Sequence, residues 1–182
     1  MRSILDVGCG RGEWLELLYE NKLAASGVDI NRVLVQQCNE RGFDVLEGDC
    51  IDHLQSLDEN SLGAITAVHL VEHLPLNILL TFLNETYRVL KPNGVAIFET
   101  PNPENIIVGS CNFYFDPTHR NPLPPQLMKF TMESRGFARV EIKRLHPCDE
   151  ELMIEDDGSE VVKRINSSLY GPQDYAVIGY KA

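Results

Sequence analysis

Short apolar runs alternate with longer stretches of helical hydrophobic spacing along most of the chain. An apolar run of about four to eight residues between turn residues predicts a strand, and one that is apolar almost throughout is covered on both faces. The runs recur at intervals that leave room for a helix between most of them. The predicted strands are Ser3–Val7, Ala25–Asp29, Asp44–Glu47, Leu62–Val68, Val95–Thr100, Arg139–Leu145 and Tyr175–Tyr180.

The stretches between these strands carry apolar residues three and four positions apart, which predicts amphipathic helices. Asn31 can cap one helix with its side-chain oxygen, and Pro92 and Gly94 end another. The segment Asn102–Pro122 is rich in proline, asparagine and aromatic residues and is predicted to be a long loop, of the kind that is usually functional or partly structured. The predicted helices are Glu13–Tyr19, Arg32–Arg41, Pro75–Leu90 and Pro125–Arg135.

The alternation of strands and helices predicts an α/β fold, with a parallel sheet joined by right-handed crossovers. The 182 residues are expected to form a single domain, residues 1–182. No apolar run approaches the roughly 20 residues of a membrane helix, so no membrane insertion is expected. Asp6 interrupts the first apolar run, which argues against a signal peptide and favours a cytoplasmic protein.

Charge and cysteine content exclude several classes of partner. The net charge of −11 argues against nucleic acid and against an anionic membrane surface, because both attract basic proteins. The five cysteines include no CxxC pair, so neither a zinc site nor a disulfide framework is expected, and the sequence predicts no metal. The segment Cys148–Glu160 holds seven acidic residues and no basic one. It is either a solvated face or a negative flap that repels anionic acceptors.

A glycine-rich turn, Gly8–Gly12, lies between the first predicted strand and the first predicted helix. Glycines at this point let a ligand approach the backbone and the free N–H groups of the helix N-terminus. Gly8 and Gly10 fit the dinucleotide fingerprint, but Glu13 occupies the position of its third glycine. A carboxylate there would repel a pyrophosphate. The turn therefore favours a nucleoside without phosphates, and a nicotinamide oxidoreductase is the disfavoured alternative.

Two carboxylates follow the next two predicted strands. Asp29 ends the second strand and can accept hydrogen bonds from ribose hydroxyls. Asp49 follows the third strand and can accept from an adenine amino group, while Ile30 offers the base an apolar face. Each aspartate alone fits a turn or a helix cap equally well. Together with the glycine turn they lie at the strand ends where open α/β sheets bind ligands.

Five motifs in this order resemble the class I S-adenosylmethionine-dependent methyltransferases. The resemblance implies a Rossmann-like, doubly wound, mixed seven-stranded sheet whose last strand is antiparallel and lies beside the sixth. It also implies S-adenosyl-L-methionine as the cofactor. The motifs are Leu5–Gly12, Gly27–Ile30, Gly48–Cys50, Val71–Leu74 and Arg88–Gly94.

The resemblance also assigns positions around the cofactor. The methionine part would lie among Asp6, Gly8 and Gly10. The ribose hydroxyls would bind Asp29, and the adenine would meet Asp49 and the backbone N–H of Cys50. His69, just after the fourth predicted strand, would lie near the sulfonium.

The segments Glu99–Pro103 and Asp116–His119 are similar to methyltransferases encoded among surface-polysaccharide genes. This similarity implies a small-molecule or glycan hydroxyl as acceptor. Family members carry one or two helices before the first strand, whereas the first predicted strand here begins within three residues of Met1. We therefore expect a domain without this cover. The alternatives are a non-catalytic binding module or one domain of a larger glycan-modifying enzyme.

A hydroxyl acceptor gains from a general base, and imidazole titrates near neutral pH. His119, in the predicted loop, is the preferred base, although it could instead hydrogen-bond the loop backbone. His69 is the second candidate, and Glu99 and Asp116 are candidates for binding acceptor hydroxyls. Cys111 has no basic neighbour in the sequence to activate it as a nucleophile. The sequence does not indicate an oligomeric state.

Overall fold

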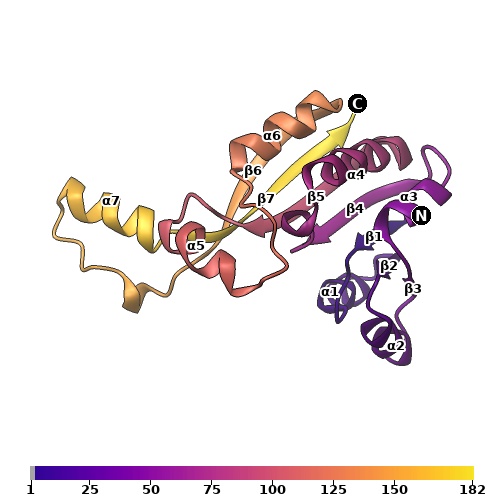
Figure 1. Ribbon diagram of the computed structural model, residues 1–182, viewed down its shortest axis with the longest axis horizontal. Helices are drawn as coiled ribbons and strands as arrows, with labels where there is room; N and C mark the ends of the chain where they lie inside the picture. Colours follow the sequence, from indigo (N-terminus) through magenta and orange to yellow (C-terminus); the bar gives the residue numbers. More distant parts are fainter. Residues whose placement is uncertain (1–2) are drawn as a thin grey trace.

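The computed structural model describes residues 3–182 as a mixed sheet of seven strands with helices packed against it (Figure 1). The strand order is β3-β2-β1-β4-β5-β7-β6. The first five strands are mutually parallel, and β7 is antiparallel to both β5 and β6. This confirms the predicted doubly wound sheet with an antiparallel last strand beside the sixth. The strands are β1 (Ile4–Val7), β2 (Ala25–Asp29), β3 (Val45–Glu47), β4 (Leu62–Val68), β5 (Leu90–Pro101), β6 (Phe137–Pro147) and β7 (Pro172–Lys181).

Seven α-helices connect the strands in residues 3–182, with short 3₁₀ helices between them. No helix in this range is long and apolar enough to cross a bilayer. The α-helices are α1 (Glu13–Glu20), α2 (Arg32–Glu40), α3 (Cys50–Ser56), α4 (Leu76–Val89), α5 (Ile106–Ser110), α6 (Pro125–Ser134) and α7 (Glu160–Leu169). The 3₁₀ helices are η1 (Val71–His73), η2 (Asn112–Phe115) and η3 (Glu150–Leu152).

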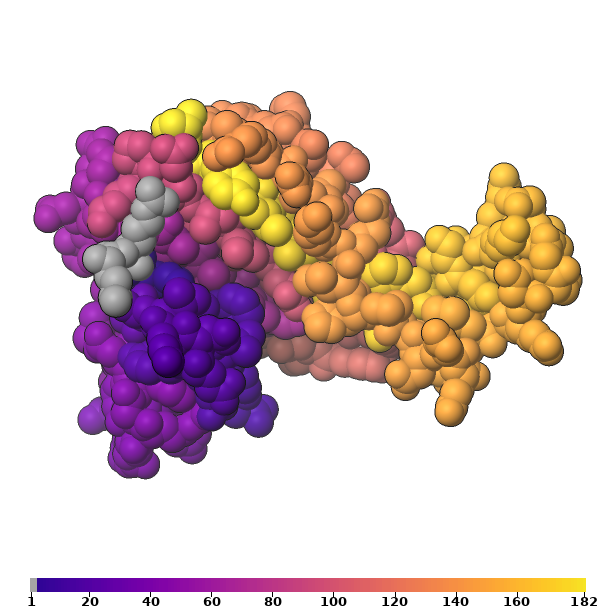
Figure 2. Space-filling view, turned by 180° about the vertical axis from the view of Figure 1, so that it is seen from behind, coloured from indigo at the N-terminus to yellow at the C-terminus, as the bar shows by residue number. Residues whose placement is uncertain are grey.

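The hydrophobic core has two parts, one formed with α3, α4 and α6 and the other with α1 and α2. The larger cluster joins α3, α4 and α6 to the sheet, with Phe82 of α4 packed against Phe98 of β5. The smaller cluster joins Leu15 of α1 and Val35 of α2 to β3. Seen from behind, the yellow β7 lies on the surface between pink atoms of the middle of the chain and the orange atoms of the segment before it, as its pairing with β5 and β6 requires (Figure 2).

Four predicted helices and all predicted strands are present, with shifted ends. The largest shift is in β5, which begins at Leu90 directly after α4, so Pro92 and Gly94 lie within the strand. The predicted loop Asn102–Pro122 contains α5 and η2 and is partly structured. The helices α3 and α7 were not predicted. α3 has only seven residues, and α7 follows the acidic segment, although its apolar residues Val162, Ile165 and Leu169 have helical spacing.

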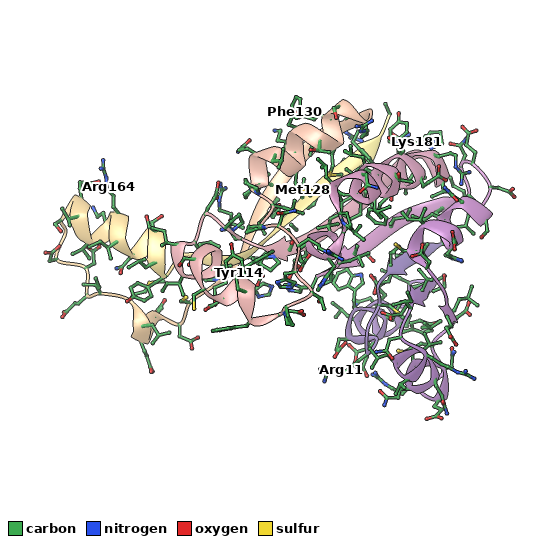
Figure 3. All side chains as sticks on the ribbon, viewed as in Figure 1. Arg11, Tyr114, Met128, Phe130, Arg164 and Lys181 are labelled. Atoms are coloured by element: carbon green, nitrogen blue, oxygen red, sulfur yellow. The ribbon has the colours of Figure 1, made fainter. Side chains whose placement is uncertain are left out.

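An arm between β6 and β7 projects from the sheet and ends in α7 (Figures 1 and 2). The arm carries the acidic segment Cys148–Glu160, and α7 lies beside α5. No side chain of α7 is fully buried, and Arg164 points away from the rest of the chain (Figure 3). The acidic residues are therefore placed at the carboxyl end of β6, on the ligand edge, as expected for a flap.

Candidate functional site

The glycine turn after β1 adopts a backbone that other residues rarely adopt. Gly8, Gly10 and Gly12 have φ values of 70°, 55° and 81°. A Cβ at Gly8 would lie 3.1 Å from Cδ1 of Leu70, whereas a Cβ at Gly10 would meet nothing within 4 Å. The turn is thus closed at Gly8 by Leu70 and open at Gly10. An open backbone position at a helix N-terminus is available to a ligand.

Asp29 fixes this turn to the end of β2. Its Oδ2 accepts a hydrogen bond from the backbone N–H of Gly10 at 2.9 Å, and its Oδ1 accepts from Asn31 at 2.7 Å. Each carboxylate oxygen has a second lone pair for a ligand hydroxyl. The next residue, Ile30, leaves 76% of its surface exposed beside the carboxylate. Asp29 therefore offers oxygen atoms that can accept hydrogen bonds from ligand hydroxyls, and Ile30 offers an apolar surface beside them.

A cavity of about 220 Å³ lies between the glycine turn and the ends of β2 and β3. Most of its lining is apolar, and Asp29 and Asp49 supply its charged groups. An apolar slot with a few polar groups at one side is typical of a nucleoside site. The lining residues are Gly8, Val28, Asp29, Ile30, Gly48, Asp49, Cys50, Leu70 and Leu74.

Asp49 has a structural role as well as a place in this cavity. It caps α3, because its Oδ1 accepts hydrogen bonds from Ile51 N–H at 2.8 Å and Asp52 N–H at 3.2 Å. The cap explains why α3 begins at Cys50, and it leaves Oδ2 for a ligand. Burial raises the pKa of the Cys50 thiol to about 11, so this cysteine is a neutral wall residue and no nucleophile.

A second cavity, of about 410 Å³, shares Gly8 and extends past Gly10 to His69. Asp6 lines it and is buried, with its Oδ1 accepting a hydrogen bond from the Thr66 hydroxyl at 2.7 Å. Burial raises the pKa of Asp6 to about 7, against the lowering effect of the Thr66 hydrogen bond. A cationic ligand group in this cavity would find a carboxyl that is ready to ionise.

The raised pKa of Asp6 predicts a pH-dependent contribution to stability. The folded state holds the Asp6 proton more tightly than the unfolded state, so this stability is present below pH 4 and is lost as the pH rises through about 7. Each unit of pKa difference corresponds to about 1.4 kcal/mol. We therefore expect Asp6→Asn, which cannot ionise, to gain a few kcal/mol relative to wild type between pH 4 and pH 8.

Denaturant unfolding of both proteins at pH 4, 5.5, 7 and 8 measures this difference. The quantity to compare is the difference in unfolding free energy between wild type and Asp6→Asn, because the other carboxyl groups titrate equally in both proteins. A constant difference in unfolding free energy across this range would show that Asp6 has an ordinary pKa in the folded state.

Glu72 is the centre of a polar cluster behind the two cavities. Its side chain is fully buried in η1, between the end of β4 and the start of α4. Its Oε2 accepts a hydrogen bond from the Thr100 hydroxyl at 2.8 Å, and its Oε1 accepts one from Nδ1–H of His69 at 3.1 Å. The Nε2 atom of His119 lies 3.9 Å from the same Oε1. A buried carboxylate therefore holds two histidines from separate segments.

His69 is oriented by this carboxylate and remains half exposed in the second cavity. Its backbone is left-handed, with φ 51°, which a non-glycine residue adopts rarely. The hydrogen bond that His69 donates to Glu72 raises the pKa of His69, against the opposing effect of burial. Because Nδ1 is the donor to Glu72, Nε2 is the ring atom that faces the cavity side, 3.8 Å from Oδ1 of Asp174.

His119 lies at the end of the segment after β5 and is mostly buried. Its Nδ1–H donates to the Phe113 carbonyl at 2.6 Å, and its ring packs against those of Phe113 and His73. The hydrogen bond fixes the tautomer, so Nε2 is the basic atom of the neutral ring. The contact with Phe113 fits the alternative in which His119 organises the loop, and the role of general base stays a prediction.

A third cavity, of about 150 Å³, lies beside His119 and Asp174. Burial raises the pKa of Asp174. Oδ1 of Asp174 lies 3.8 Å from Nε2 of His69, so Asp174 connects this third cavity with the second cavity, which His69 lines. The lining residues are Pro101, Val108, Asn112, Phe113, His119, Gln173 and Asp174.

Other sequence candidates lie apart from this cluster. Asp116 is exposed and accepts hydrogen bonds from the backbone and hydroxyl of Thr118, which places it in a turn. Cys111 is exposed at the end of α5. Tyr114 is exposed and lies on the segment after β5 (Figure 3), whereas Phe113 is buried. Phe113 therefore packs the loop, whereas Tyr114 and Phe115 do not.

The sequence did not single out Glu72 as an orienting residue or Asp174 as a wall of the site. Glu72 was part of a recognised motif, and its position three residues after His69 was the only signal of the hydrogen bond between them. Asp174 follows the acidic arm in β7, and only the pairing of β7 with β5 brings it to this edge.

The described residues fit the expected nucleoside cofactor. Gly10 leaves open space at the turn, the first cavity is largely apolar, and carboxylates lie where hydroxyl and amino groups would bind. All of the predicted cofactor residues line one of two adjoining cavities, which share Gly8: Asp6, Gly8, Gly10, Asp29, Ile30, Asp49, Cys50 and His69.

Comparison with known proteins agrees with this geometry. The family described as "Methyltransferase domain" matches residues 5–98, just over half of the chain. The crystal structure of an S-adenosylmethionine-dependent methyltransferase from Archaeoglobus fulgidus is 37% identical and superimposes with a TM-score of 0.91. The alignment covers 99% of this chain and 86% of that protein.

Two curated relatives are longer than this chain. A probable S-adenosylmethionine-dependent methyltransferase of Mycolicibacterium smegmatis is 26% identical over 138 residues, which are 75% of this chain and 52% of the relative. The ubiquinone biosynthesis O-methyltransferase of Alkalilimnicola ehrlichii is 27% identical over 106 residues, which are 56% of this chain and 42% of the relative. The chain therefore spans about half the length of these relatives or less.

Proposed function

We propose a reaction for this chain from the premise that it belongs to the S-adenosylmethionine-dependent methyltransferase family. The proposed reaction is O-methylation of a hydroxyl group on a small molecule or a glycan. The observation that carries it is the position of His119, which lies beside a buried carboxylate and lines a cavity next to Asp174, itself 3.8 Å from His69 on the cofactor side. Separate contacts support the cofactor site, the general base and the acceptor site.

The cofactor would be held along the ends of β1, β2 and β3. Asp29 would bind the ribose hydroxyls, and the cavity beside Ile30 and Cys50 would take the adenine. Asp6 would meet the methionine amino group in the second cavity, near His69. S-adenosylmethionine supplies an electrophilic methyl group, whose bond to sulfur breaks as the new carbon–oxygen bond forms, with the electron pair remaining on sulfur.

His119 would take the proton of the acceptor hydroxyl at Nε2. The Phe113 carbonyl holds its Nδ1–H, which keeps Nε2 free in the neutral ring. The negative charge of Glu72, 3.9 Å away, would stabilise the imidazolium that forms. This arrangement of a fixed tautomer and a nearby carboxylate is that of an oriented general base.

The third cavity is the proposed acceptor site. It combines an aromatic wall from Phe113 with the polar side chains of Asn112, Gln173 and Asp174. Such a lining suits a ring that carries hydroxyl groups. The net charge of −11 and the acidic arm favour a neutral acceptor over an anionic one. The similarity of Glu99–Pro103 and Asp116–His119 to enzymes of surface-polysaccharide synthesis supports a sugar hydroxyl.

Binding of S-adenosylhomocysteine is the first test of the proposal. A ligand at 100 times its dissociation constant adds about 2.7 kcal/mol to the unfolding free energy, which gives a clear thermal shift. We expect such a shift with S-adenosylhomocysteine and none with NAD. A shift with NAD alone, or with neither ligand, would contradict the proposed cofactor site.

Acceptors are then screened with S-adenosylmethionine labelled in its methyl group, using neutral sugars, phenols and their amine analogues. Label transferred to hydroxyl compounds supports O-methylation, and label only on amines overturns it. Binding of S-adenosylhomocysteine with no transfer to any acceptor would favour the alternative, a binding module without catalysis.

A further inference from the structure

Four of the five histidines of the chain gather at the edge of the sheet formed by the carboxyl ends of β4, β5 and β6 and the amino end of β7, although they come from separate segments. Two of them, His69 and His146, face the carboxylates of Asp174 and Glu99, to which the proposed reaction gives no step in proton or methyl transfer. His69 Nε2 lies 3.8 Å from Oδ1 of Asp174, and His146 Nε2 lies 3.3 Å from Oε1 of Glu99. Ligand atoms of His69, Glu99 and Asp174 all lie within 4.8 Å of one another.

The sheet register produces this convergence. Val68, the residue before His69, pairs with Glu99, and the backbone N–H of His69 donates to the Glu99 carbonyl at 3.0 Å. Asp174 of β7 pairs with Pro101, two residues beyond Glu99 in β5. Side chains two residues apart lie on the same face of a strand, so Glu99 and Asp174 share a face.

The fourth side chain, His146, lies on the edge strand β6. Leu145 of β6 pairs with Asp174, and His146 follows with a left-handed backbone at φ 53°. This backbone breaks the alternation of the strand and lets the His146 ring reach Glu99. His146 is 61% exposed, whereas the side chains of Glu99 and Asp174 are 20% exposed. The group is therefore a half-open cluster with its carboxylates on the inner side.

The cluster also has a built outer layer. Glu72, fully buried, accepts the Nδ1–H of His69 and is itself held by the Thr100 hydroxyl. Metal-ligating histidines almost always donate their second ring N–H to a carboxylate or a carbonyl, which directs the other nitrogen at the metal. His69 has this arrangement, with Nε2 directed toward Asp174.

Within residues 3–182, neither Glu99 nor Asp174 forms an ion pair with a lysine or an arginine. From this geometry we propose that His69, Glu99 and Asp174 bind one divalent first-row transition cation such as Zn²⁺ or Mn²⁺. His146, whose Nε2 lies 3.3 Å from Oε1 of Glu99, lies next to this group and becomes a further ligand only if its exposed side chain moves. Imidazole and carboxylate ligands together suit these ions. Ligands about 2.1 Å from one ion lie about 3.0–3.4 Å apart, so small side-chain movements close the site.

The role of this cation, though not its binding, rests on the proposed function. His69 lines the second cavity and Asp174 lines the third, so the cation lies between the cofactor side and the acceptor side. All protein ligands of the cation come from one side of the sheet edge. The cation therefore has an open coordination position that an acceptor oxygen can occupy. The substrate class then narrows to acceptors with a hydroxyl beside a second oxygen ligand, such as a vicinal diol.

A neighbouring group, Glu72 with His73 and His119, is a weaker candidate for the same ion. Glu72 already accepts hydrogen bonds at both oxygens, and Nδ1 of His119 donates to Phe113. Nδ1 of His73 contacts the Thr118 hydroxyl at 2.9 Å. Both oxygens of Glu72 are thus engaged, and Nε2 of His119 is kept for the proposed base, so the cation is assigned to the cluster at Glu99 and Asp174.

Isothermal titration of chelator-treated full chain with ZnCl₂, and with MnCl₂ to avoid thiol ligands, tests the proposal. We expect one ion per chain and binding that is lost in Asp174→Asn and in His69→Gln. Glu72→Gln, which changes only the outer layer, should weaken binding about 10–100-fold. His53→Gln, which removes the histidine outside the cluster, is the matched control and should bind as wild type does.

Binding of S-adenosylhomocysteine is measured on the same samples, so failure of the cofactor site is seen separately from failure of the metal site. No metal binding by protein that binds S-adenosylhomocysteine overturns the proposal. Equal metal affinity in wild type and Asp174→Asn overturns it as well, because the ion is then adventitious. If Asp174→Asn does not fold, Glu99→Gln takes its place with the same expected loss.

Discussion

Asp29→Asn is expected to bind S-adenosylhomocysteine about 10–100-fold more weakly than the wild-type chain. The Asp29 carboxylate already accepts hydrogen bonds from Gly10 and Asn31, so an amide in its place loses charge and one acceptor oxygen. A hydrogen bond to a charged group contributes about 1.5–3 kcal/mol. A factor of ten in the dissociation constant corresponds to about 1.4 kcal/mol. Isothermal titration calorimetry at fixed ionic strength measures the change.

The matched control is Asp44→Asn. Asp44 lies just before β3, at the opposite end of the sheet from the proposed site, and its side chain is exposed. The substitution makes the same change in net charge, so it separates the local effect from the effect of the overall field. Equal affinity in Asp29→Asn and wild type would show that Asp29 only holds the glycine turn, and would remove it from the cofactor site.

The fold could be predicted largely from the sequence because its strands are apolar runs and its turns are marked by glycine, proline and asparagine. The differences have local causes. α3 has only seven residues and was not predicted, although the alternative role of Asp49 as a helix cap is the one that begins this helix. β5 begins earlier than predicted because the turn residues Pro92 and Gly94 lie inside the strand. α7 has no fully buried side chain and follows the acidic segment, and the helical spacing of its apolar residues Val162, Ile165 and Leu169 was not recognised.

The cofactor half of the proposed site could be inferred from the sequence, because its residues lie at or just after the carboxyl ends of β1, β2, β3 and β4. The arrangement of the acceptor half could not, although His119 itself was a candidate. Glu72, Thr100 and His119 meet only when η1, β5 and the segment after β5 pack together. The cluster of His69 with Glu99 and Asp174 depends on the register of β5 with β7. The sequence excluded a metal on its cysteines, whereas the candidate ligands are histidines and carboxylates far apart along the chain.

His119→Asn is expected to lower kcat for the best hydroxyl acceptor by about 10²–10⁴-fold, the usual contribution of a general base. Asparagine can still donate an N–H to the Phe113 carbonyl, so it preserves the contact that organises the loop. It has no basic nitrogen at the position of Nε2. The affinity for S-adenosylhomocysteine should stay close to that of wild type, because His119 does not line either of the two cofactor cavities.

Steady-state kinetics with the labelled methyl donor separates the two roles of His119. If the ring only organises the loop, His119→Asn changes KM for the acceptor or the melting temperature and leaves kcat near its wild-type value. If it is the base, kcat falls while KM and the melting temperature change little. His53→Asn, which removes a histidine on α3 away from the Glu72 cluster, is the control and should leave kcat unchanged. A wild-type kcat in His119→Asn would transfer the role of base to another group, with His69 the next candidate because Glu72 orients its ring.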